Sequence, residues 1–314
     1  MDEFALIRRY FSAIGSGDGV HLGVGDDAAV LEVPSGDLLV TATDTLVAGA
    51  HFPLDEPAAA VGYRAVAVNV SDFAAMATRP RWFTLALTLP NADSEWLQSF
   101  SAGLRDAALV NDITLVGGDT TRGPLTISLT VLGCAPTESI RRRDGAKAGD
   151  TLLVSGPLGD AAGGLRLLET GTVDTGAERH LVERFRRPPS RWRLAIRAAP
   201  QLHAAIDVSD GLLADLAHLA TASGVAAEVD AGRLPCSDEL LERFGEGDAL
   251  RFALTGGDDY ELLVAAPASA VAELETLGFI AIGRFALGEG VHVSGGPDLG
   301  LADSGYRHFR DAAS

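Results

Sequence analysis

Apolar residues recur along the chain with the periods of helices and strands. In residues 94–111, Leu97, Phe100, Leu104 and Ala108 stand at helical spacing, so this segment should be a helix with one core-facing side. Similar patterns predict helices at Phe4–Phe11, Pro57–Met76, Leu212–Ala222 and Ala268–Leu277, and strands at Leu38–Thr43, Trp82–Leu89, Leu125–Cys134, Asp150–Ser155 and, as a pair, within Phe279–Ser294. We therefore expect a β-rich α/β domain in residues 1–137 and an α+β domain in residues 138–314.

The segment Ile113–Gly123, Ile-Thr-Leu-Val-Gly-Gly-Asp-Thr-Thr-Arg-Gly, is predicted to form a binding site at the end of a strand. Its β-branched start is typical of a buried strand, and the two glycines would let the backbone turn so that Asp119 projects at the exit. A carboxylate followed by two hydroxyls and an arginine suits a metal ion beside phosphate oxygens. An ordinary turn would also use these residue types.

Further aspartates occur in similar surroundings in the first half. Asp26 and Asp27 follow a glycine, and such adjacent acids would be stabilised by a cation. Asp44 stands where a strand is predicted to end. Asp72 lies in an apolar helical segment, where an unpaired charge would be costly; as an alternative, Ser71 or Asp72 could cap a helix.

The second half repeats this theme. Asp207 and Asp210 flank Ser209 between a predicted short strand and a helix, and Gly-Gly-Asp returns at Asp258. The paired phrases hint at two related halves, although they are too short to establish a repeat. Several carboxylates from both halves could hold Mg²⁺ ions, which prefer carboxylate oxygens and retain water.

Composition excludes some classes of phosphate-binding protein. The 314 residues include one lysine, Lys147, in a context that fits neither a P-loop nor a protein kinase. Phosphates would therefore have to be bound through metal ions, arginines and backbone amides. The net charge of −18 repels polyanions, so we expect no nucleic-acid partner.

The remaining features predict a cytoplasmic protein with no membrane partner. No apolar run reaches membrane-spanning length, and the N-terminus carries acids where a signal peptide would carry bases. Cys134 and Cys236 lie far apart without metal-ligand spacing, so both are expected to be buried thiols rather than a disulfide or zinc site.

Five phrases, in order along the chain, resemble the thiamine-monophosphate kinase family: Gly25–Ala28, Ser71–Met76, Val116–Gly123, Asp207–Leu212 and Gly256–Leu262. The resemblance implies the two-domain fold of aminoimidazole ribonucleotide synthetase, with an N-terminal domain that binds ATP and Mg²⁺ and builds a β-barrel across a homodimer. It also implies ATP-dependent phosphorylation of thiamine monophosphate to thiamine diphosphate with several Mg²⁺ ions. The transfer would be direct and in line, without a catalytic side chain, because these phrases offer no obvious nucleophile.

The resemblance also assigns roles residue by residue. The metal ligands would be Asp27, Thr43, Asp44, Asp72, Asp119, Asp207 and Asp210; ATP would contact Gly118, Asp119, Arg143 and Ser209; and thiamine monophosphate would contact His51, Asp258 and Tyr306. At Asp258 the family often has glutamate, so this contact would be one methylene shorter.

Alternatives remain open from the residues alone. Two relatives with the same fold do not fit: selenophosphate synthetase would need a reactive cysteine or selenocysteine near the N-terminus with a lysine close by, and the first thirty residues contain neither, while the hydrogenase-maturation relative would end in cysteine and this sequence ends in Arg-Asp-Ala-Ala-Ser. An aminoimidazole ribonucleotide synthetase-like enzyme matches fewer of the phrases. A non-catalytic acidic cation-binding protein, or a metal-dependent phosphatase, would also explain the aspartates.

Overall fold

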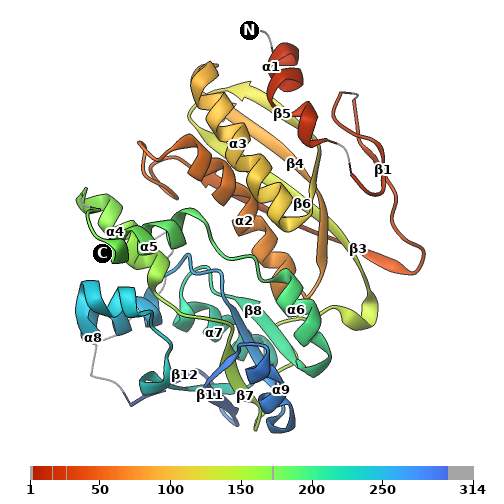
Figure 1. Ribbon diagram of the computed structural model, residues 1–314. Helices are drawn as coiled ribbons and strands as arrows, with labels where there is room; N and C mark the ends of the chain where they lie inside the picture. Colours follow the sequence, from red (N-terminus) through yellow and green to blue (C-terminus); the bar gives the residue numbers. More distant parts are fainter. Residues whose placement is uncertain (1–2, 16, 26, 172, 296–314) are drawn as a thin grey trace, which may run out of the picture. The chain divides into compact units, whose positions relative to one another are not determined.

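The computed structural model describes residues 3–15, 17–25, 27–171 and 173–295. It divides into two compact units, Met1–Ile140 and Arg141–Ser314, which are described separately below (Figure 1). Among the described residues, no helix combines the length and the apolar character needed to cross a membrane.

The first unit is built on an open four-stranded sheet. Its order is β3 (Asp37–Val47), β6 (Thr126–Pro136), β4 (Arg79–Leu89) and β5 (Thr114–Arg122). Only the β4–β5 pair is parallel. Helices α2 (Ala58–Ala75) and α3 (Ser94–Asn111) lie side by side across one face of the sheet (Figure 1). The helix α1 (Glu3–Tyr10) and a small antiparallel pair, β1 (Val20–Leu22) and β2 (Val30–Leu31), complete the unit.

Helix α3 shows how the local sequence defines an element. The Asp93 carboxylate caps the helix by accepting hydrogen bonds from the backbone N–H groups of Glu95 and Trp96 at 2.8 and 3.1 Å. Leu97, Phe100 and Leu104 are buried, as their spacing predicts. The helix ends at Asn111, the next residue Asp112 has the left-handed conformation, and the predicted bounds are confirmed.

The predicted turn at the two glycines of the first unit is wrong. Strand β5 continues through Gly117 and Gly118 to Arg122, and it pairs with β4 on both sides of an irregularity at Val116. The ladder supplies partners for backbone groups that a turn would leave to water or side chains. For the same reason Asp44 lies within β3, which continues to Val47, and not at a strand end.

The second unit contains a six-stranded sheet. Its order is β12 (Val291–Ser294), β9 (Ala226–Asp230), β11 (Ile280–Ala286), β7 (Thr151–Val154), β10 (Leu262–Ala266) and β8 (Ala204–Asp207). All neighbours are antiparallel except β12 and β9. The predicted pairing of the two last strands with each other is wrong, because β9 lies between β11 and β12.

Helices of the second unit bury two apolar clusters. Leu212, Leu216 and Leu219 of α7 (Leu212–Ser223) pack into the main cluster with residues of the sheet such as Leu152 and Leu263. A smaller cluster is formed by α4 (Asp160–Thr170), α5 (Gly176–Arg186) and α8 (Asp238–Thr255). The shorter helices are α6 (Trp192–Ala198) and α9 (Val271–Thr276), the latter preceded by a 3₁₀ turn at Ala268–Ala270.

Candidate functional site

A cavity of about 490 Å³ lies beside β5 in the first unit. Two of the predicted metal ligands, Asp27 and Asp119, line it, together with Gly118 of the same strand. The rest of the wall is largely apolar: Ile7, Phe11, Val24, Ala28, Ala29, Leu85, Leu115 and Val116. Two exposed carboxylates beside an apolar wall suit a ligand that has both a cation-bound anionic part and a flat apolar part.

Gly118 forms part of this wall because of its backbone. Its φ is +155°, and a Cβ built there would lie 1.9 Å from the carbonyl oxygen of Leu85 on β4. Only glycine permits this approach between the two strands. The strand pairing, rather than a turn, therefore places the neighbouring Asp119 in the cavity wall.

Asp44 and Asp72 lie in the same part of the first unit. The backbone N–H of Asp44 donates to Asn69 Oδ1 at 2.9 Å, and Asn69 precedes Asp72 by three residues on one face of α2. Asp72 does not cap a helix start, because it lies in the last turn of α2. The helix dipole is negative there, so a cation bound near this carboxylate would stabilise it.

Two other predicted site residues, Thr43 and His51, lie in β3 and in the turn after it. Thr43 is exposed and its hydroxyl bonds to that of Thr130 at 2.8 Å. His51 Nδ1 accepts a hydrogen bond from the backbone N–H of Val47 at 2.9 Å, so Nδ1 is unprotonated in this geometry and the ring orientation is fixed.

In the second unit, a buried residue that sequence reasoning missed organises the loop between β8 and α7. Asp215 Oδ2 accepts hydrogen bonds from the backbone N–H groups of Ser209, Asp210 and Gly211 at 3.0, 3.0 and 3.1 Å. Its sequence signal is an acid in the first turn of the helix that follows Ser-Asp-Gly. The contact fixes the backbone that carries Ser209 and Asp210.

Negative charge accumulates around this loop. Burial and, to a lesser extent, the charges of Asp207 and Asp210 raise the pKa of Asp215 to about 7, although the backbone N–H donors of Asp210 and Ser209 partly oppose this rise. A divalent cation bound to Asp207 or Asp210 would relieve this repulsion, so the donor set fits a metal that prefers oxygen.

Asp258 also lies against the loop. Its backbone N–H donates to the Ser209 carbonyl at 2.8 Å, so Ser209, Asp210 and Asp258 belong to one local structure. The Gly-Gly-Asp phrase here follows helix α8, whereas the first one lies within strand β5, so the hint of an internal repeat is not supported.

The predicted metal ligands are divided between the units, with Asp207 and Asp210 in the second and the others in the first. Within the described residues, no three His, Cys, Asp or Glu side chains are arranged to hold a metal ion by themselves. Magnesium commonly uses one or two carboxylates and takes its other oxygens from water and phosphate. Arg143 is exposed, with its carbonyl accepting a hydrogen bond from Ser223, and Tyr306 lies outside the described residues.

Comparison with known proteins first shows the class of protein to which the two domains belong. The family "AIR synthase related protein, N-terminal domain" matches residues 25–135, and "AIR synthase related protein, C-terminal domain" matches residues 147–293. The chain therefore has the two-domain fold of proteins related to AIR synthase, with the mixed sheets described above.

The more specific relatives are kinases. Thiamine-monophosphate kinase of Escherichia coli K12 is 42% identical over 318 residues, which cover 98% of each chain. A crystal structure of thiamine-monophosphate kinase from Stenotrophomonas maltophilia K279a has 46% identity and a TM-score of 0.88, covering 94% of this chain and 97% of that one. A structure of AaThiL complexed with AMPPCP and TMP has 35% identity and a TM-score of 0.81, covering 91% and 92%. The chain belongs to the thiamine-monophosphate kinase family.

Proposed function

We propose that this protein transfers a phosphoryl group from ATP to thiamine monophosphate and so produces thiamine diphosphate. The observation that carries the proposal is the 42% identity to the E. coli kinase across 98% of both chains. The structural similarity to AaThiL complexed with AMPPCP and TMP supports the same pair of substrates.

Mg²⁺, when bound, would neutralise phosphate charge, as it does in other phosphoryl transfers. We propose that Asp27, Thr43, Asp44, Asp72, Asp119, Asp207 and Asp210 bind these ions. Two groups of carboxylates support this assignment. One lines the cavity of the first unit, and the other surrounds the Ser209 loop.

Substrate contacts are proposed at the remaining positions. ATP would contact Gly118, Asp119, Arg143 and Ser209, and thiamine monophosphate would contact His51, Asp258 and Tyr306. The fixed ring of His51 and the loop-bound backbone of Asp258 and Ser209 suit this positioning role. No catalytic side chain is proposed, since positioning and charge neutralisation suffice for direct transfer.

The assembly and location are part of the proposal. The N-terminal domain, residues 1–137, would bind ATP and Mg²⁺ and would pair with a second copy to build a β-barrel. The domain of residues 138–314 would complete the enzyme, which we expect to act in the cytoplasm. The open edge strands β3 and β5 of the first sheet are compatible with such pairing.

The test is to incubate the protein with Mg²⁺, ATP and thiamine monophosphate and to measure thiamine diphosphate and ADP. We expect equal amounts of both products, with little ADP formed when free thiamine or water is the acceptor. Release of inorganic phosphate without thiamine diphosphate would instead indicate a phosphatase. Cation binding without turnover would indicate a non-catalytic protein.

A further inference from the structure

The segment Asp258–Tyr260 has an unusual backbone. Both Asp258 and Tyr260 have positive φ angles, +71° and +51°, although neither is glycine. Residues with side chains avoid this region unless the surrounding structure holds them there. The contacts that hold this segment therefore decide where Asp258 lies.

One side of the segment is held by backbone hydrogen bonds. Asp258 N–H donates to the Ser209 carbonyl and Tyr260 N–H donates to the Val208 carbonyl, each at 2.8 Å. In return, Val208 N–H donates to the Glu261 carbonyl at 2.8 Å. The segment is thus joined to the loop that carries Asp210.

The other side is held by two buried carboxyl groups. Asp259 accepts hydrogen bonds from the N–H groups of Gly159 and Ala161, at 2.6 and 3.2 Å, where α4 begins. Glu261 is fully buried and receives three guanidinium hydrogen bonds, one from Arg184 at 3.0 Å and two from Arg191 at 2.7 and 2.6 Å.

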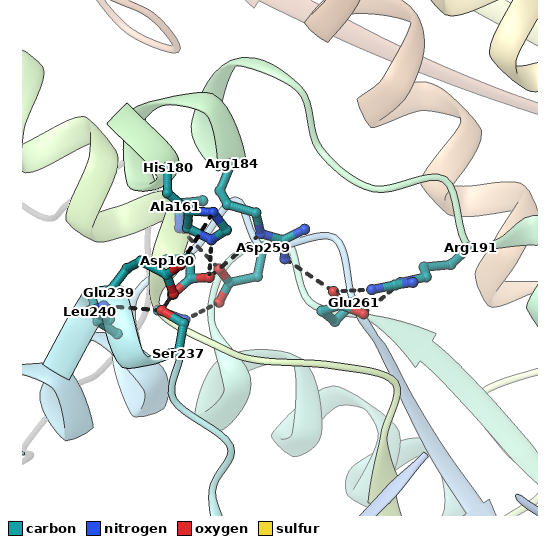
Figure 2. A network of polar contacts seen from close by, with 11 residues as sticks. Asp160, Ala161, His180, Arg184, Arg191, Ser237, Glu239, Leu240, Asp259 and Glu261 are labelled. Carbon is teal, nitrogen blue, oxygen red and sulfur yellow. Dashed lines mark hydrogen bonds and ion pairs between the residues drawn. The ribbon is translucent and has the colours of Figure 1, made fainter. Parts of the chain in front are cut away.

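Figure 2 shows how these ionic contacts are connected. Arg184 lies between Asp160 and Glu261, and Arg191 approaches Glu261 from another side. The forked guanidinium of Arg191 uses two nitrogens on one carboxylate, which fixes direction as well as distance. Glu261 is therefore a rigid anchor immediately after the strained segment.

Tyr260 connects this anchor to the Asp258 side chain. Its hydroxyl donates to Asp258 Oδ1 at 3.2 Å, and Tyr260 as a whole residue is 9% exposed. The ring is held by packing, so the hydrogen bond limits the orientations that the Asp258 carboxylate can take.

We propose that Glu261 and Tyr260 are positioning residues for the thiamine monophosphate contact at Asp258. Glu261 fixes the backbone through Arg184 and Arg191, and Tyr260 orients the carboxylate. The inference rests on the proposed function, because it concerns the same substrate. It adds that a buried ion-pair network, with no substrate contact of its own, sets the geometry of substrate binding.

The test compares Glu261→Gln and Tyr260→Phe with a matched control, Glu178→Gln. Glu178 is also a buried glutamate of the second unit and pairs with Arg243 at 2.7 Å, but it caps α5 and has no contact with the segment among those described here. Each variant is assayed for the KM of thiamine monophosphate, the KM of ATP, kcat and thermal unfolding.

We expect Glu261→Gln to raise the KM of thiamine monophosphate about tenfold or more, since displacement of a positioning group by about 1 Å can cost about 100-fold. Tyr260→Phe should raise this KM about threefold to tenfold, because it removes one hydrogen bond worth about that much. Tyr260→Phe should change the KM of ATP by less than about twofold, and Glu178→Gln should lower the unfolding temperature without changing either KM.

Unchanged KM values for thiamine monophosphate in the two variants would overturn the inference. Glu261 would then contribute only to the stability of the fold. If Glu261→Gln does not fold, Tyr260→Phe decides the question, because it removes only a hydroxyl. A wild-type enzyme inactive on thiamine monophosphate would overturn the proposed function and this inference together. Active wild type with unaffected variants would overturn only the inference.

Discussion

Replacement of Gly118 by alanine tests whether strand pairing, rather than a turn, builds the cavity of the first unit. The added methyl group would lie 1.9 Å from the Leu85 carbonyl oxygen and 2.8 Å from its carbonyl carbon. Both are backbone atoms of the paired strand β4, so no side-chain rotation can make room. The two strands would have to separate by about 1 Å to reach even a close contact of about 3 Å.

The expected loss of stability has two sources. Overpacking in a packed region costs about 1–3 kcal/mol, and a φ of +155° for a residue with a side chain costs about 1–3 kcal/mol more. Alanine regains about 0.4–1 kcal/mol by restricting the unfolded chain. We therefore expect the free energy of unfolding of the first unit to fall by about 2–5 kcal/mol.

The neighbouring glycine supplies the control. A Cβ at Gly117 would lie 3.9 Å from Thr84 Cγ2, an ordinary contact, so Gly117→Ala should change stability by less than about 1 kcal/mol. Urea unfolding followed by tryptophan fluorescence can compare the two variants, because Trp82 and Trp96 both lie in the first unit. Equal stability of Gly118→Ala and Gly117→Ala would refute the close approach of β4 and β5.

Three further predictions concern charge and protonation. Asp119→Asn and Asp210→Asn should each lower phosphoryl transfer by about 100-fold or more while leaving the unfolding midpoint unchanged, since each removes metal charge and no core packing; full activity in an ADP-release assay would contradict the metal assignment. Burial raises the pKa of Asp259 to about 8, offset in part by the Gly159 N–H and by Arg184, so the native state holds a proton that the unfolded chain loses near pH 4. Its contribution to stability should therefore fall as pH rises from about 5 to 8, by up to about 1.4 kcal/mol per pH unit, and denaturation curves of Asp259→Asn should show a weaker pH dependence than the wild type, with the remainder coming from Asp215. Burial raises the pKa of the Cys236 thiol to about 11 and also raises that of Cys134, so iodoacetamide at pH 8 should alkylate both slowly until denaturant is added; rapid labelling of the native protein would show that the thiols are accessible.

The local sequence was sufficient to predict those elements whose structure depends on residues close to one another in the chain. The bounds of α3 follow from its capping residue Asp93 and its apolar spacing, and Asp27 and Asp119 of the predicted acidic phrases line the cavity of the first unit. The family could also be recognised from the sequence, because five separate phrases occur in the same order along the chain.

Tertiary structure decided what distant residues do for one another. The two glycines of β5 suit a turn by themselves, yet they continue a strand because β4 pairs with both of them, despite an irregularity in the ladder at Val116. The strands β11 and β12 are close in sequence but are separated by β9. The guanidinium groups that bind Glu261 come from residues 77 and 70 positions earlier, which no local periodicity can predict. Short-range patterns determine where elements form and which residues they carry, whereas long-range packing selects the partners that fix those residues in place.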